Sequence, residues 1–277
     1  MDKDVIEKEQ EVSASKPEKK KKKPLWIAIF TISILLCIGC IIYIIMVLWP
    51  SDDVDDLASK VKKPILTEDN KPDADTKNVK NPIDFDKLRK INKDIVAWIK
   101  IDDTNIDYPV LRAPSNDQEY YLHRDYKKNY LFAGSIYMES YNKADFSDRD
   151  TILYGHNMAN GSMFAHLHKF EDTDFFSKHS TYHIYTPDSI KTYKVYSAYE
   201  YDNRHINNSF KHFVDDDVFQ EYIDYSLKPT SAILSNVRKG SKVTIDDKLV
   251  TLSTCTNNRP QNRYLVQGVL IKDEPTD

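Results

Sequence analysis

The chain carries the stretch Leu249-Val250-Thr251-Leu252-Ser253-Thr254-Cys255, which decides the fold and indicates the chemistry. Its residue types favour a β-strand, on which alternate residues from Leu249 to Cys255 share one face. Cys255 ends the stretch and is the only cysteine outside an apolar N-terminal segment. A lone thiol at a strand end is a candidate nucleophile, and an inert buried cysteine is the commoner alternative.

A positive side chain follows the thiol at a short distance. Residues 256–262 contain several asparagines and a proline, so they predict a loop, and residues 263–271 predict the next strand. In a hairpin of these strands, Cys255 and Arg263 meet at the open end, where a guanidinium stabilises an oxyanion. Arg259, in mid-loop, is the competing candidate. Arg263 is favoured because a strand holds a side chain more rigidly than a loop does.

His156 is the candidate acid–base partner of the thiol, because a cysteine nucleophile usually needs an imidazole. Of the eight histidines, it alone follows a predicted strand, residues 151–154, directly at a glycine turn. Catalytic side chains are commonly presented on such loops. Context alone leaves a catalytic and a structural role equally open for this histidine.

Metal and nucleic-acid chemistry find no support in the sequence. His166, His168, His179 and His183 lie near one another, but their spacing fits no standard zinc pattern, so neither a metal nor a cofactor is expected. The formal net charge of −4 does not favour a nucleic-acid partner. With one cysteine outside the apolar segment, no disulfide can form there.

Residues 25–49 carry no charge and predict a single transmembrane anchor. At about 1.5 Å per residue, a helix of this length reaches roughly 37 Å. Lysines 19–23 precede it and acidic residues follow it, so residues 1–24 are predicted to be a cytoplasmic tail. A cleaved signal peptide is the alternative, but its apolar region is usually about 7–15 residues and ends in a small-residue cleavage site.

The remainder divides into a linker and one domain. Residues 50–80 contain prolines among Asp, Lys and Asn, which predicts an extracellular linker. Residues 81–277 are long enough to bury a core, and we expect this domain to lie outside the cell membrane.

Predicted strands are 95–101, 106–111, 134–138, 151–154, 182–185, 192–201, 242–245, 249–255 and 263–271. Predicted helices are 84–91, 162–170, 173–179 and 215–227. Many short strands with few helices favour a mixed, mainly β barrel.

These motifs together resemble the sortases, membrane-anchored cysteine transpeptidases of Gram-positive bacteria. Thr251–Cys255 matches the TLxTC motif, with Tyr154-Gly155-His156-Asn157-Met158 upstream and Arg263-Tyr264-Leu265-Val266 downstream. The resemblance covers about residues 81–273. It is closest to class B, because of the helical lead-in from Asp84 and the helix over residues 215–227.

The resemblance implies a closed sortase-type β-barrel with peripheral helices, preceded by a single N-terminal transmembrane helix. It implies that Cys255 attacks a Thr–x bond in the C-terminal sorting signal of a secreted surface protein. His156 would protonate the leaving amine, and Arg263 would hold the substrate carbonyl. A peptidoglycan precursor amine would then resolve the thioacyl enzyme.

Three further positions match the substrate groove of the family in local alignment: Ser253, Leu122 and Ile206. Ordinary packing or loop roles are equally open for each, because groove and core positions look alike in sequence. Two other functions also stay open: a membrane-tethered cysteine peptidase that hydrolyses, and a surface adhesin with an inert thiol.

Overall fold

The computed structural model describes residues 25–48, 52–62, 79–114, 117–202, 204, 206–230, 234–259 and 261–277. The chain divides into two compact units, Met1–Ile45 and Met46–Asp277. The predicted cytoplasmic tail, residues 1–24, lies outside the described residues. Helix α1 (Leu25–Leu48) follows it, and its segment Trp26–Ile45 is long and apolar enough to cross a membrane, with none of it buried.

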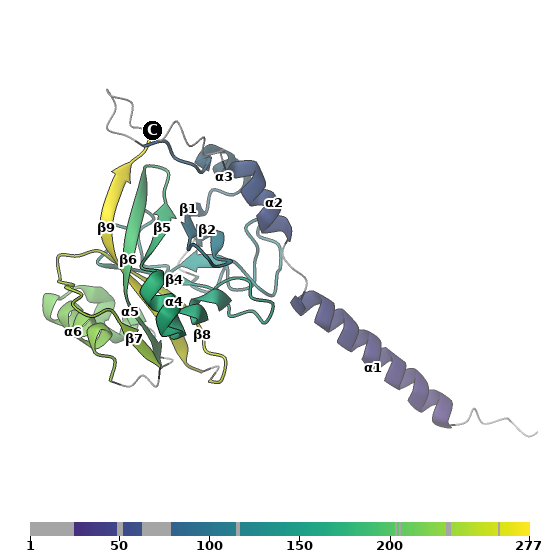
Figure 1. The fold of residues 1–277 in the computed structure, drawn as a ribbon. Helices are drawn as coiled ribbons and strands as arrows, with labels where there is room; N and C mark the ends of the chain where they lie inside the picture. The colour runs from purple at the N-terminus through teal and green to yellow at the C-terminus, as the bar shows by residue number, and fades with distance from the viewer. Residues whose placement is uncertain are drawn as a thin grey trace, which may run out of the picture. The chain divides into compact units, whose positions relative to one another are not determined.

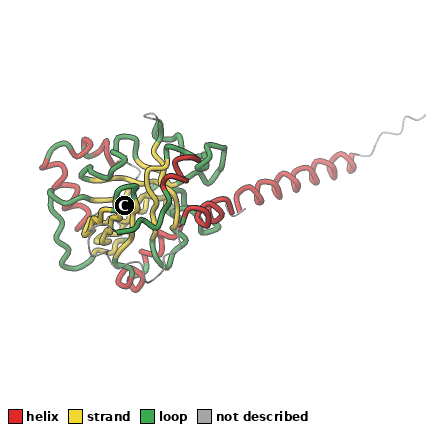
Figure 2. The backbone as a smooth tube through the Cα atoms, turned by 90° about the horizontal axis from the view of Figure 1, so that it is seen from above, coloured by secondary structure: helices red, strands yellow, loops and turns green. Residues whose placement is uncertain are grey.

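The second unit is built on a closed sheet. Eight strands follow one another in the order β5-β1-β2-β3-β4-β8-β9-β6, and β5 pairs again with β6, which closes the barrel. A ninth strand, β7, extends the sheet from β6. Helices surround the strands (Figures 1 and 2). The closed, mainly β barrel predicted from the sequence is therefore confirmed. The strands are β1 (Ile95–Lys100), β2 (Asp107–Arg112), β3 (Ile136–Met138), β4 (Asp150–Tyr154), β5 (Thr181–Tyr185), β6 (Ser189–Tyr201), β7 (Ser235–Val237), β8 (Leu249–Cys255) and β9 (Arg263–Pro275).

Strand β8 lies at the centre of the fold and is buried on both faces until its last residue. Val250 and Leu252 belong to the larger core cluster, whereas Leu249 packs in a second cluster with residues of helix α6 (Asp216–Leu227). Because successive side chains of a strand point to opposite faces, those of β8 pack alternately into the two core clusters. Both cores hold β8 in place, and the strand in turn fixes the position of Cys255.

The predicted helices appear with small changes of boundary. Asp84 caps α3 (Phe85–Ile91) by accepting a hydrogen bond from the amide of Lys87. Three more match predicted segments: the 3₁₀ helix η1 (Ala165–Glu171), α4 (Thr173–Lys178) and α6. Two short helices were not predicted, α5 (Ile206–Ser209) and the 3₁₀ helix η2 (Lys211–Phe213).

One predicted strand is wrong, and one strand was missed. Residues 242–245 form no strand, because their apolar Val243 is buried at a turn in which Thr244 bonds to Asp247. Strand β7 has the polar sequence Ser-Asn-Val, and it forms through pairing with β6 rather than through any local pattern.

The predicted linker, residues 50–80, also needs correction. Helix α2 (Asp52–Val61) occupies its first part, and Val54, Leu57 and Val61 are buried in the larger core. These three lie at intervals of three and four, on one helical face, among aspartates that hide the pattern. Residues 63–78 lie outside the described residues.

Candidate active site

Two strand pairings bring the predicted catalytic residues to one edge of the barrel. In the β8–β9 hairpin, Cys255 pairs with Arg263 as the last residue pair. Strand β4 runs parallel to β8, with Tyr154 opposite Ser253, so the segment after β4 leaves at the same edge. His156 lies in that segment. The hairpin predicted from the sequence is therefore present in the predicted register.

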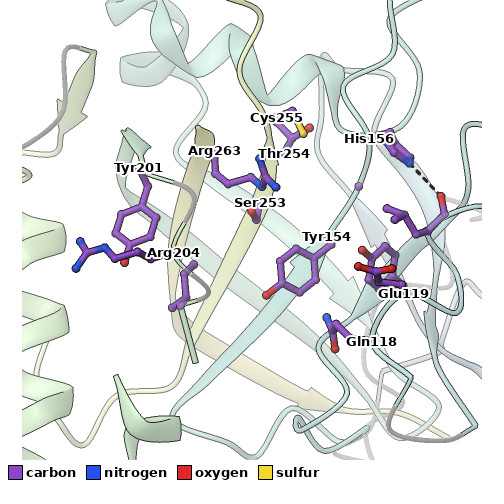
Figure 3. Close-up of a pocket in the computed structure, with 14 residues that line it drawn as sticks. Gln118, Glu119, Tyr154, His156, Tyr201, Arg204, Ser253, Thr254, Cys255 and Arg263 are labelled. Carbon is purple, nitrogen blue, oxygen red and sulfur yellow. Dashed lines mark hydrogen bonds between the residues drawn. The ribbon is translucent and has the colours of Figure 1, made fainter. Parts of the chain in front are cut away.

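A cavity of about 240 Å³ lies at this edge. All six residues singled out from the sequence line it: Cys255, His156, Arg263, Ser253, Leu122 and Ile206. Figure 3 shows Cys255, Arg263 and His156 grouped on one side of the cavity, with Tyr154 below them. The barrel thus gathers residues that are separated by up to 141 positions in the chain.

His156 is held by packing and by one hydrogen bond. The preceding Gly155 approaches Ile136 and Phe164 so closely that a Cβ would lie 2.5 Å from Ile136 Cδ1, so glycine is needed there. The Nε2 atom of His156 lies 3.0 Å from the carbonyl oxygen of Leu122, and its ring stacks on His123 at 5.3 Å between centroids.

The electrostatic surroundings of His156 favour the neutral ring. Burial lowers the pKa of His156; the bond to the Leu122 carbonyl opposes this, and the charges of His123 and Arg263 add to the lowering. A carbonyl oxygen can only accept, so Nε2 carries the proton of the neutral ring. The other nitrogen, Nδ1, is then the free base.

Cys255 is partly exposed, as a nucleophile must be. The guanidinium of Arg263 extends from the neighbouring strand toward Thr254 and Cys255 (Figure 3). Its Nη1 donates to the carbonyl oxygen of Asn262 at 3.2 Å. A fixed positive charge beside a thiol and its substrate carbonyl is suited to stabilising negative charge that develops there.

Arg259, the competing arginine, does not line the cavity. Its Nη2 donates to Glu200 Oε2 at 2.7 Å, and Asn262 donates to the other oxygen of this carboxylate at 2.6 Å. Glu200 is buried on β6. Arg259 therefore binds the loop to the barrel and is not a solvated loop residue.

Sequence reasoning missed several residues that line the same cavity. Tyr154 precedes His156 by two positions, and its hydroxyl donates to the buried Glu139 at 3.0 Å. Glu119 and Arg204 lie on opposite sides of the cavity (Figure 3). Only Tyr154 had a usable signal, its place at the end of a strand, since the other two come from irregular loops. The remaining lining residues are Gln118, Tyr137, Gly155, Tyr201 and Thr254.

The histidines considered as metal ligands each have another partner. His166 Nδ1 accepts from the amide of Asn105, and His179 bonds to Asp103. Within the described ranges, no group of three or more His, Cys, Asp or Glu side chains is placed to hold a metal ion.

Comparison with known proteins agrees with this barrel fold. The Sortase domain family model matches residues 99–271. The chain therefore belongs to the sortase family, whose members are cysteine transpeptidases.

The relatives are of the predicted class. Sortase B of Listeria monocytogenes serovar 1/2a is 38% identical over 205 residues, covering 72% of this chain and 79% of the relative. Sortase B of Staphylococcus aureus is 34% identical over 190 residues, covering 68% and 75%. A Cys→Ser mutant of Clostridium perfringens sortase B has a TM-score of 0.66 and 28% identity, with 80% of this chain and 99% of that chain covered. The prediction of a class B sortase is confirmed.

Proposed function

We propose that this transpeptidase cleaves a Thr–x bond in the C-terminal sorting signal of secreted proteins and joins them to an amine of a peptidoglycan precursor. The observation that carries the proposal is the β8–β9 register, which sets Cys255 opposite Arg263 at the barrel edge. His156 lines the same cavity. The three residues supply a nucleophile, an acid–base group and a fixed positive charge.

The first half of the reaction forms a thioester. Neutral His156 takes the thiol proton of Cys255 at Nδ1, and the sulfur attacks the carbonyl carbon of the substrate threonine. Arg263 stabilises the oxyanion of the tetrahedral intermediate. The C–N bond then breaks, and His156 returns its proton to the departing amine.

The second half transfers the acyl group. The acceptor amine attacks the thioester carbon, the C–S bond breaks, and the proton lost by the amine passes through His156 to the sulfur of Cys255. The products are an amide and the resting enzyme, so no other reactant is needed. Water in place of the amine would give hydrolysis.

The three groove positions identified from the sequence line the wall of the cavity. Ser253 is 2% exposed and Ile206 3% exposed, while Leu122 is only partly buried. We assign these three side chains to the contacts with the sorting signal. Staphylococcus aureus sortase B has been solved in a complex with substrate, and that structure has a TM-score of 0.64 and 27% identity to this chain.

Helix α1 is proposed to anchor the enzyme in the cell membrane as a single pass. Lysines 19–23 favour a cytoplasmic N-terminus, so we expect the barrel to lie outside the cell. There it meets secreted proteins and peptidoglycan precursors, as cell-wall anchoring requires. Protease added to wall-free cells should release a fragment that begins within residues 50–80. A mature chain that lacks residues 1–49 would instead show a cleaved signal peptide.

The decisive experiment measures ligation directly. The full chain in detergent is incubated with a library of Thr-containing sorting-signal peptides, with and without an amine acceptor, and the products are analysed by mass spectrometry. A ligated product supports the proposal. Cleavage without ligation at saturating amine identifies a peptidase, and no cleavage with slow alkylation of Cys255 identifies an adhesin.

A further inference from the structure

The carbonyl oxygen of Cys255 receives hydrogen bonds from two side chains. His168 Nε2 lies 2.9 Å from this oxygen, and Asn157 Nδ2 lies 3.0 Å from it. His168 comes from η1, and Asn157 directly follows His156. Neither side chain lines the substrate cavity. Two separate segments thus bond to the backbone of Cys255 from outside the substrate cavity.

His168 is itself held in a fixed orientation. Its Nδ1 lies 2.5 Å from Glu171 Oε1, one turn later in η1. Its ring stacks on Tyr264, 5.0 Å away and on β9, and its side chain is 11% exposed. The ring therefore packs between β9 and the end of β8, and these contacts restrict its rotation.

The ring of His168 belongs to one hydrogen-bonded cluster around the Cys255 carbonyl. Its Nε2 lies 2.9 Å from that oxygen and 3.2 Å from Asn157 Nδ2. Asn157 Nδ2 also bonds to the Cys255 carbonyl and to Asn257 Oδ1 at 2.7 Å. Glu171 fixes the ring within this cluster through Nδ1.

We propose that His168, held in place by Glu171, is a positioning residue for Cys255. It fixes the carbonyl of Cys255 and thereby the direction of the thiol. The inference rests on the proposed role of Cys255 as nucleophile. Misplacing a reacting atom by a small distance lowers the rate of a positioned reaction strongly.

The kinetic test separates positioning from substrate binding. His168→Ala should lower kcat tenfold or more and leave KM within twofold, because His168 lies outside the cavity. His168→Gln retains a donor that can bond to the Cys255 carbonyl, so its kcat should lie between those of His168→Ala and the wild type. His166→Ala, on the same 3₁₀ helix, is the matched control and should retain the wild-type kcat. An unchanged kcat in His168→Ala overturns the proposal, as does a rise in KM that accounts for the whole loss.

A spectroscopic test does not depend on turnover. In the full chain labelled with ¹³C-carbonyl cysteine, the signal that Cys255→Ala removes should shift in His168→Ala and stay in place in His166→Ala. An unmoved signal in His168→Ala overturns the proposal. If the wild type ligated no peptide, the proposed function would fail, while this measurement would still decide whether His168 holds the Cys255 carbonyl.

A folding defect in His168→Ala leaves Glu171→Ala as the deciding variant. It removes the acceptor that fixes Nδ1 and leaves the ring of His168 in the chain. Because the Glu171 side chain is partly exposed, the thermal unfolding midpoint should lie close to that of the wild type, with kcat at least threefold lower. A wild-type kcat in Glu171→Ala overturns the proposal.

Discussion

Arg259 and Glu200 form an ion pair that fastens the loop after Cys255 to the barrel, with 2.7 Å between Nη2 and Oε2. The Glu200 side chain is 5% exposed and that of Arg259 42%. Asn262 donates to the same carboxylate at 2.6 Å. The pair therefore spans the barrel edge and holds both the middle and the end of residues 256–262.

Removing Arg259 should destabilise the fold, because it leaves a buried carboxylate with fewer partners. Breaking a fully buried pair costs roughly 3–5 kcal/mol. Since Arg259 is partly exposed and Asn262 remains, we expect Arg259→Ala to lower the free energy of unfolding by about 1–3 kcal/mol. Denaturant unfolding measures this, with the exposed-pair variant Arg204→Ala as control. Equal losses in the two variants would contradict a special role for the buried carboxylate.

Cys255→Ala should abolish cleavage of a sorting peptide and leave the fold intact, because the thiol is the proposed attacking group. Circular dichroism checks the fold, and mass spectrometry checks the products. The double variant Cys37→Ser/Cys40→Ser is the matched control, since both of these cysteines lie in α1. Turnover that persists in purified Cys255→Ala would rule out this nucleophile.

His156→Ala should lose nearly as much activity as Cys255→Ala, because the departing amine needs a proton. His183→Ala is the control: that ring lies on β5 and bonds to Thr192. The comparison uses kcat/KM for one peptide and one amine. A larger loss in His183→Ala than in His156→Ala would show that the acid–base group is misassigned.

Asp150 predicts how stability depends on pH. Its Oδ2 accepts from Thr251 at 2.8 Å, while Oδ1 is buried without a hydrogen-bond partner among the described residues. Burial raises the pKa of Asp150 to about 7 from 3.8. The folded state therefore binds this proton more tightly than the unfolded state does.

The sign of the effect follows from that difference. Asp150 makes its full contribution to the free energy of unfolding below pH 3.8, and this contribution is lost as pH rises through about 7. Between pH 3.8 and about 7, the free energy of unfolding falls by roughly 1.4 kcal/mol per pH unit. Asp150→Asn should remove this slope, so the free energy of unfolding should fall less between pH 5 and pH 8 than it does in the wild type. Urea titrations at both pH values measure it. The same slope in both proteins would show that Asp150 is ionised in the folded state at pH 5.

Local sequence patterns predicted the barrel and the pairing of Cys255 with Arg263 at its edge, because both depend on the alternation of side chains along a strand. Alternation along β8 and the length of the loop place Cys255 opposite Arg263, as the register shows. The glycine turn after β4 similarly indicated His156. Residues close in the sequence determine the Cys255–Arg263 pairing, whereas His156 joins them through the pairing of β4 with β8.

Features that depend on distant partners could not be predicted in this way. The sequence placed Arg259 in mid-loop as a competing candidate and could not show its ion pair, because its partner Glu200 lies 59 residues earlier. The contact of His168 with Cys255 spans 87 residues and follows only from the closure of the barrel. Glu119 and Arg204 reach the cavity from irregular loops that carry no periodic signal.

Replacing Arg263 should mainly lower activity, whereas replacing Arg259 should mainly lower stability. Arg263 lines the cavity, and its charge and forked donors both bear on the oxyanion. Arg263→Ala should cost roughly 2.7–4 kcal/mol of transition-state stabilisation, as removal of one oxyanion donor does. Arg263→Lys retains the charge without the fork, so it should keep weak activity. Neither change should alter the unfolding free energy as much as Arg259→Ala does.

Measuring kcat/KM and unfolding free energy for all three variants separates the two roles. Arg263→Ala should lose activity and keep stability, because the side chain acts on the substrate. Arg259→Ala should lose stability and, where it remains folded, retain more activity than Arg263→Ala, because its guanidinium is occupied by Glu200. A severe loss of activity in folded Arg259→Ala beside a near-normal Arg263→Ala would reverse the assignment. The loop would then have to release Arg259 from Glu200 during turnover.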